Sequence, residues 1–332
     1  MIRYLLSRLV TMALTLVAIS VLVFAIIQLP PGDYLTSYIA EIQAQGEQVT
    51  AERIAFLREE YGLDRPLWEQ YLVWATGLLH GDLGYSFEYS QPVADVVGER
   101  MPLTLLLNAA TVLFIYLVSF PIGIYSATHQ YSWTDHGLSF LGFLGLATPN
   151  FLLALILLYL ANVWFGTSIG GLMAPEYIDE PWSLGKVGSV FAHLWVPVLV
   201  IGTAGTAGMI RRLRANLLDE LNRQYVITAR AKGLPERTIL FKYPLRMALN
   251  PFIADLGGIL PQIVSGSVII SAVMSLPTTG PMLLSSLRSQ DMYLAGSFLM
   301  FLALLTVVGM FISDILLAVL DPRIRLGAKS AR

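Results

Sequence analysis

The sequence predicts an all-α integral membrane protein with six transmembrane helices and a small helical loop domain outside the membrane. Hydrophobic residues make up 55% of the 332 residues, and charged residues only 13%. A soluble domain carries about 25% charged residues, so this chain has too few to cover a soluble surface. The composition therefore excludes an ordinary cytosolic protein, a disordered chain and a nucleic-acid binder.

Six segments are long and apolar enough to cross a bilayer, which requires about 20 residues. The predicted spans cover residues 9–32, 101–127, 138–165, 189–210, 248–276 and 293–320. A cleaved secretory signal is the alternative for the first segment. Its length, and its end at Pro30-Pro31 without a small-residue cleavage site, favour an uncleaved span.

The charges predict an orientation with both termini in the cytoplasm. With the N-terminus inside, segments 1–8, 128–137, 211–247 and 321–332 hold 15 of the 21 Lys and Arg residues. The outer segments hold 16 of the 23 Asp and Glu residues. Lys and Arg near the ends of spans resist translocation, so this asymmetry indicates which side is inside. We expect an N-terminal helix (1–30), an extracytoplasmic loop domain (31–100), a transmembrane core (101–320) and a cytoplasmic tail (321–332).

Two loops are too long to be simple connectors. The outer loop is predicted to contain a helix over 50–61 and a second helix from Pro66, where proline suits the first turn. A turn-rich motif then follows: His80, Gly81, Asp82, Leu83 and Gly84. This loop either contacts a partner outside the membrane, or stabilises the bundle as a lid or as helices on the bilayer.

The inner loop, 211–247, is predicted to form a helix, a tight turn and another helix. Gly233 follows a helical run that ends at Lys232, and glycine after a cationic last turn is typical of a helix end. Pro235 and Glu236 suit the start of a second helix. The small residues Ala229 and Ala231, with Gly233, would let a partner approach the backbone closely.

Several kinds of chemistry are missing from the sequence. It contains no phosphate-binding Gly-x-x-x-x-Gly-Lys-Ser/Thr loop, no His-Glu-x-x-His and no Gly-x-Ser-x-Gly element. Zero cysteines exclude a disulfide framework and a thiolate metal site. The four histidines are scattered near predicted membrane boundaries, which favours interfacial positions over a metal site. We therefore expect no catalytic residues, no metal and no cofactor in this chain.

Five motifs, in order along the chain, carry a family resemblance. They are Pro31-Gly32-Asp33, Tyr61-Gly62-Leu63-Asp64-Arg65-Pro66, His80-Gly81-Asp82-Leu83-Gly84-Tyr85-Ser86, residues 225–234 and Asp321-Pro322-Arg323-Ile324-Arg325. Over nearly its full length the chain resembles the permease subunits of binding-protein-dependent ABC importers, in the dipeptide/oligopeptide branch. The resemblance implies a bacterial inner-membrane complex with a second homologous permease, two subunits that bind ATP and Mg²⁺, and an extracytoplasmic substrate-binding protein.

The resemblance also implies a docking role for the inner loop. In this family the loop contains a coupling helix that contacts an ATP-hydrolysing subunit. The matching residues are Thr228, Ala229, Arg230, Ala231, Lys232, Gly233, Leu234 and Pro235. The family's Glu-Ala-Ala start is Ile227-Thr228-Ala229 here, so the glutamate is absent.

The sequence gives less specific evidence for the residues that line a translocation pathway. Span five is rich in small and polar residues, and its candidate lining residues are Asp255, Gln262, Ser265 and Ser267. Ionisable residues inside a membrane often line a pathway, whereas Ser and Gln also bridge helices by hydrogen bonds. Peptides are the expected cargo. The alternatives are an oligosaccharide or nickel, a self-contained secondary transporter, or a membrane scaffold without transport.

Overall fold

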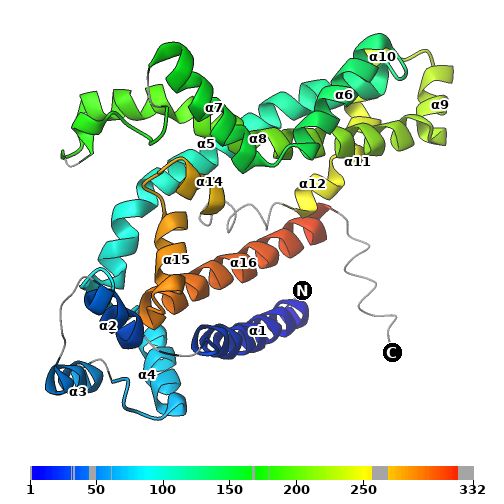
Figure 1. Cartoon of the computed structure of the whole chain (residues 1–332). Coiled ribbons are helices and arrows are strands. Elements are labelled where there is room, and N and C mark those ends of the chain that lie inside the picture. The colour runs from blue at the N-terminus through cyan, green and yellow to red at the C-terminus, as the bar shows by residue number, and fades with distance from the viewer. Residues whose placement is uncertain are drawn as a thin grey trace. The chain divides into compact units, whose positions relative to one another are not determined.

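The computed structural model describes residues 2–30, 32, 34–44, 50–60, 62–166, 169–178, 180–255 and 268–320. In these ranges the chain is almost entirely helical, with one antiparallel hairpin of two short strands (Figure 1). The chain divides into two compact units. Unit 1 comprises residues 1–102 and 278–311, and unit 2 comprises residues 103–277 and 312–332.

Unit 1 combines the N-terminal third of the chain with a segment from near its C-terminus. Its helices are α1 (Ile2–Gln28), α2 (Tyr34–Ala44), α3 (Ala51–Glu60), α4 (Leu67–Leu79), α15 (Thr279–Arg288) and most of α16 (Met292–Leu320). Strands β1 (Tyr85–Ser86) and β2 (Gln91–Pro92) pair between α4 and α5 (Val93–Thr128). Helices α3 and α4 confirm the two helices predicted in the outer loop, whereas α2 and the hairpin were not predicted.

Unit 2 contains the rest of α5 and the helices that follow it. These are α6 (Trp133–Ala147), α7 (Asn150–Phe165), the 3₁₀ turn η1 (Pro175–Tyr177), α8 (Leu184–Leu221), α9 (Gln224–Ala231), α10 (Glu236–Lys242), α11 (Pro244–Ala248), α12 (Asn250–Ala254) and α14 (Val268–Val273). Helix α8 is the longest of the described helices, and both α6 and α11 pack against it.

Four of the described helices are long and apolar enough to cross a membrane: Ser7–Gln28, Val93–Thr128, Leu184–Leu221 and Met292–Ile315. They correspond to predicted spans one, two, four and six. Helices α6 and α7 together would make a fifth span, bent by 95°. The predicted fifth span, 248–276, falls largely on residues 256–267, which lie outside the described residues. The total of six spans therefore stays a prediction.

The prediction of one continuous helix near 138–165 is wrong, although α6 and α7 together can form the predicted span. The chain leaves the helix at Thr148, which is extended (φ −86°, ψ 118°), and α7 starts after Pro149. Proline clashes with a helical residue before it, and its missing N–H cannot continue the α6 ladder. Because the break contains no charged residue, hydropathy stays high across it and conceals it.

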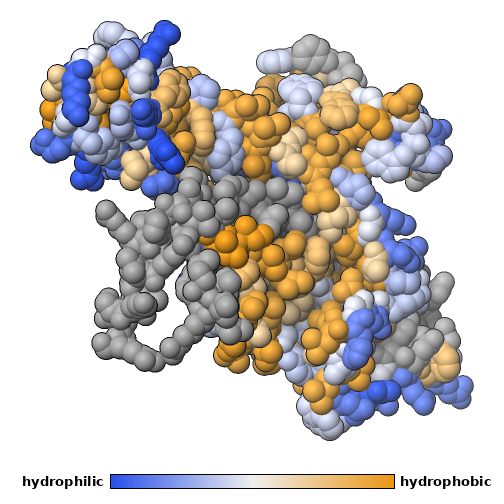
Figure 2. Space-filling view, turned by 180° about the vertical axis from the view of Figure 1, so that it is seen from behind, coloured by the Kyte–Doolittle hydropathy of each residue, from blue (hydrophilic) through white to orange (hydrophobic). Residues whose placement is uncertain are grey.

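The surface of both units matches a lipid environment. Large apolar side chains are exposed along the long helices, including Leu14 at 66%, Leu117 at 65% and Trp195 at 62%. Figure 2 shows hydrophobic residues over much of the visible face and hydrophilic residues gathered near its extremities. A soluble protein rarely exposes apolar patches of this extent.

In unit 1 the core forms where α1, α4 and α16 meet. Phe24, Ile27, Trp74, Met292 and Ala295 are buried together there. The indole Nε1–H of Trp74 donates to the hydroxyl of Ser297 at 3.1 Å. This buried hydrogen bond satisfies the polar edge of an otherwise apolar side chain.

A buried carboxylate holds the β-hairpin to the start of α16. Asp291 is 0% exposed, and its Oδ2 accepts from the Ser86 hydroxyl at 2.6 Å and from the Glu88 N–H at 3.2 Å. Its Oδ1 accepts from the Leu294 N–H at 3.1 Å, which caps α16. The carboxylate of Glu88 in turn accepts from the hydroxyls of Ser285 and Ser289.

Asp291 should make the stability of this unit depend on pH. Burial, with a smaller contribution from the Glu88 carboxylate, raises the pKa of Asp291 above its ordinary value, although the three hydrogen bonds oppose the change. The folded protein then holds a proton that the unfolded chain releases. The contribution of Asp291 to stability therefore falls as the pH rises through this raised pKa.

We expect the melting temperature of Asp291→Asn to increase relative to wild type as the pH rises from about 4 to about 7, because only wild type gains a buried charge. Thermal unfolding of the detergent-solubilised protein measures this difference at each pH. Asp95→Asn is the control, since Asp95 is an exposed acid in the first turn of α5. A difference for Asp291→Asn that does not change with pH would contradict the assignment.

Candidate functional site

The candidate site is the helix–turn–helix segment, residues 224–242, which follows α8. Helix α8 runs beyond the predicted span to Leu221, and the chain turns through Asn222 and the extended residue Arg223 (ψ 150°) before α9 begins. The predicted helical run to Lys232 is therefore interrupted once. Helices α9 and α10 lie near one end of α8 in Figure 1.

The predicted turn at Gly233 is confirmed. Gly233 adopts φ +76°, a left-handed conformation that side chains disfavour. The Gly233 N–H donates to the Arg230 carbonyl at 2.9 Å, and the Leu234 N–H donates to the Ala229 carbonyl at 3.3 Å. This pair of hydrogen bonds defines a Schellman cap, and it fixes the direction in which the chain leaves α9.

The two short helices have a small core of their own. Val226 and Ala229 of α9 are buried against Ile239 of α10, with Tyr243 packed beside them. Across the turn, the Arg230 guanidinium pairs with the carboxylate of Glu236, with Nε 2.8 Å from Oε1. The segment is therefore fixed by packing as well as by its cap.

The outside of the turn is open. All residues from Arg230 to Arg237 are exposed, and so is Thr228. Seven of the eight predicted docking residues are thus exposed. Ala229 is the exception, because at 5% exposure it belongs to the supporting core. Figure 2 shows hydrophilic residues gathered at this end of α8.

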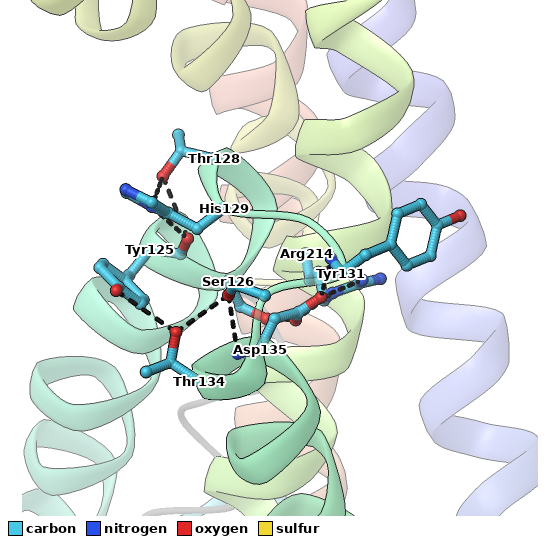
Figure 3. Close-up of polar contacts among 9 residues, drawn as sticks. Tyr125, Ser126, Thr128, His129, Tyr131, Thr134, Asp135 and Arg214 are labelled. Carbon is cyan, nitrogen blue, oxygen red and sulfur yellow. Dashed lines mark hydrogen bonds and ion pairs between the residues drawn. The ribbon is translucent and has the colours of Figure 1, made fainter.

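Two arginines at the end of α8, which sequence reasoning attributed only to membrane topology, anchor the segment. The Arg214 guanidinium forms a bidentate ion pair with Asp135 in the first turn of α6, with Nε 2.8 Å from Oδ1 and Nη2 2.7 Å from Oδ2. Figure 3 shows this pair beside the α5–α6 turn. Arg212 pairs with Asp255, which directly follows α12, and its guanidinium lies 5.0 Å from the centre of the Phe252 ring.

An apolar cluster joins these elements beneath the arginines. Leu213 and Leu217 of α8 are fully buried against Leu245 and Ala248 of α11 and against Ala127 of α5. Both ends of the segment, where it leaves α8 and where it returns through α11, therefore rest on one packed base.

The predicted pathway residues are only partly described. Asp255 is 53% exposed in its side chain and paired with Arg212, so its charge is balanced. Gln262, Ser265 and Ser267 lie outside the described residues. Within the described part of the chain, no group of three or more His, Asp or Glu residues could hold a metal ion.

The outer motif forms the turn between α4 and the hairpin. His80 caps α4, Gly81 and Gly84 adopt φ of +81° and +85°, and the Gly84 N–H donates to Asp82 Oδ1 at 2.8 Å. The Leu83 carbonyl accepts from the Ser297 hydroxyl at 2.7 Å.

A half-open cavity of about 260 Å³ lies beside this turn. Its lining residues are Val73, Trp74, Gly77, Asp82, Gly84, Tyr85, Phe87 and Tyr293. Gly84 lies so close to Tyr293 that an added Cβ would overlap the ring, with Cγ only 2.9 Å away.

We expect Gly84→Ala to be more destabilising than Gly81→Ala. Both positions have positive φ, so each alanine costs about 1–2 kcal/mol in backbone strain. Only Gly84→Ala also displaces Tyr293, which adds about 1–3 kcal/mol, because nothing lies within 4 Å of a Cβ at Gly81. Thermal unfolding of the two variants in detergent measures the difference, and equal losses would show that the close contact is unimportant.

Comparison with known proteins agrees with this arrangement. Residues 119–326 match the family described as binding-protein-dependent transport system inner membrane component, and residues 1–108 match its N-terminal region. The chain is 36% identical over 328 residues to the oligopeptide transport system permease protein AppB of Bacillus subtilis, covering 98% of this chain and 99% of the relative. It is 29% identical to the dipeptide transport system permease protein DppB of Escherichia coli, again covering 98% and 99%. The chain therefore belongs to the family of binding-protein-dependent transport system inner membrane components.

Proposed function

We propose that this chain is the permease subunit of an ATP-driven importer of di- and oligopeptides. Full-length relatives carry the names of oligopeptide and dipeptide permeases. These names favour peptides over oligosaccharide or nickel. Together with a second homologous permease, the chain would form the translocation pathway in a bacterial inner membrane, with both termini in the cytoplasm.

Energy must reach this subunit from a partner, because its sequence contains no phosphate-binding loop. Two partner subunits would bind ATP and Mg²⁺, and a substrate-binding protein would deliver the peptide from outside. On the cytoplasmic side, the proposal rests on the exposed turn of the helix–turn–helix segment. It is a fixed element with an uncovered surface, as a docking element requires.

The chemistry of this surface predicts the partner's contact site. The exposed side chains of the segment include Ile227 at 49%, Leu234 at 37% and Phe241 at 63%. Arg230, Lys232 and Arg237 lie among them, also exposed. We infer that the ATP-binding subunit offers an apolar groove with acidic residues at its rim.

Docking would transmit ATP-driven movement into the membrane helices. Both ends of the segment rest on the packed base formed by α5, α8 and α11, so a shift of the turn displaces these helices together. Binding of ATP to the partner would favour one orientation of the pathway, and its release the other, since a partner shifts an equilibrium only by binding the two states differently.

The test is affinity purification of the complex with Gly233→Trp and Gly233→Ala in parallel. Both substitutions introduce the same positive-φ strain, about 1–2 kcal/mol, but only tryptophan adds bulk at the contact surface. Nothing lies within 4 Å of a Cβ at Gly233, so the indole would project outward. We expect Gly233→Ala to retain the ATP-binding subunits and Gly233→Trp to lose them while retaining the second permease.

Two results would contradict the proposal. One is a wild-type chain that brings down no ATP-binding subunit. The other is a Gly233→Trp variant that retains these subunits as well as Gly233→Ala does, which would remove the docking role from this turn.

A further inference from the structure

The contact between α6 and α8 combines an ion pair with close packing of small residues. Near the C-terminal end of α6, Gly145 faces small side chains of α8. A Cβ at this position would lie 3.2 Å from Thr203 Cγ2 and 3.5 Å from Ala207 Cβ. Small residues allow two helices to approach closely, but they offer no long side chain that interlocks them.

The ion pair joins Asp135 of α6 to Arg214 of α8. The Asp135 side chain is 1% exposed, and the guanidinium binds both of its oxygens in a parallel fork. The hydroxyl of Ser126, on α5, donates to Oδ1, and the Tyr131 N–H of the α5–α6 turn donates to Oδ2 at 3.0 Å. One carboxylate on α6 thus joins α5, the turn and α8, as Figure 3 shows.

Such a pair fixes the position of one helix along the other more than it adds to the free energy of unfolding. Apolar residues of similar volume are often equally stabilising, because taking two charges out of water offsets their attraction. A forked arginine contact, by contrast, exists at only one relative position of the two helices. Moving α8 along α6 by one helical turn, about 5.4 Å, would break both bonds and leave a buried carboxylate unpaired.

The pair also lies on the part of α8 that leads into the helix–turn–helix segment. Arg214 lies between the buried residues Leu213 and Leu217, which pack against α11 at the base of the segment. A displacement of the helix–turn–helix segment that enters α8 therefore reaches the stretch that Arg214 ties to α6.

We propose that the Asp135–Arg214 pair is the link that makes α6 follow α8 when the ATP-binding subunit moves the segment. The inference rests on the proposed function. Asp135 and Arg214 are then positioning residues for transport. They touch no substrate, but they make α6 move together with α8 and α11.

The first experiment replaces both partners, Asp135→Ala with Arg214→Ala, so that no unpaired charge is left buried. The whole complex is reconstituted in liposomes with a substrate-loaded binding protein. We expect the subunits to stay assembled and ATP hydrolysis to stay close to the wild-type rate. Peptide uptake should fall about tenfold, so that fewer peptides enter for each ATP. Glu69→Gln, which opens the exposed Arg65–Glu69 pair in unit 1, should leave both rates unchanged.

A second experiment measures the movement itself, and its first comparison uses the otherwise wild-type complex. The chain has no cysteine, so spin labels can be placed on the exposed residues Phe140 of α6 and Ala215 of α8 after substitution by cysteine. In the otherwise wild-type complex the distance between the labels should be the same without nucleotide and with ATP under non-hydrolysing conditions. In the double-alanine variant the two conditions should give different distances.

The outcomes separate the two proposals. A label distance that changes with ATP in the wild-type complex overturns the link, and so does a double variant that imports as many peptides per ATP as wild type. Parallel loss of uptake and hydrolysis would assign the pair a merely structural role, which also overturns it. A wild-type chain that assembles with no ATP-binding subunit would instead overturn the proposed function.

Discussion

An apolar chain can bury a charged group only where fixed partners surround it, and this constraint organises both units. In unit 2 the buried carboxylate of Asp135 is matched by the Arg214 fork, a hydroxyl and a backbone N–H. In unit 1 the buried carboxylate of Asp291 instead accepts hydrogen bonds from a hydroxyl and two backbone N–H groups. The first carboxylate fixes helices to one another, whereas the second fixes a hairpin to a helix end.

The difference in partners gives the two carboxylates different properties. A bidentate arginine favours the ionised form of Asp135. Asp291 has its negative charge desolvated and lies near another acid, Glu88, so its charge is disfavoured. The carboxylate that would carry movement between helices thus has a cation beside it, whereas the carboxylate that attaches the hairpin has its pKa raised by burial.

Sequence analysis predicted those features that a short stretch of sequence determines. Hydropathy located the long helices, and Gly233 located the Schellman turn, because left-handed backbone at a helix end has a local signature. It missed the break at Thr148–Pro149, since an uncharged proline leaves hydropathy unchanged. It also missed the role of Arg214, because its partner lies 79 residues away and no short motif encodes that distance.

The spacing of the two arginines restricts how α8 can move. Residues two apart on an α-helix project about 200° from each other, so Arg212 and Arg214 reach partners on opposite sides of α8. One holds Asp255 beyond α12 and the other holds Asp135 on α6, while Leu213 between them is buried in the apolar base. Rotation of α8 about its own axis would break one contact or the other. Under the proposed function, a push at the helix–turn–helix segment would therefore tilt α8 together with its neighbours rather than rotate it.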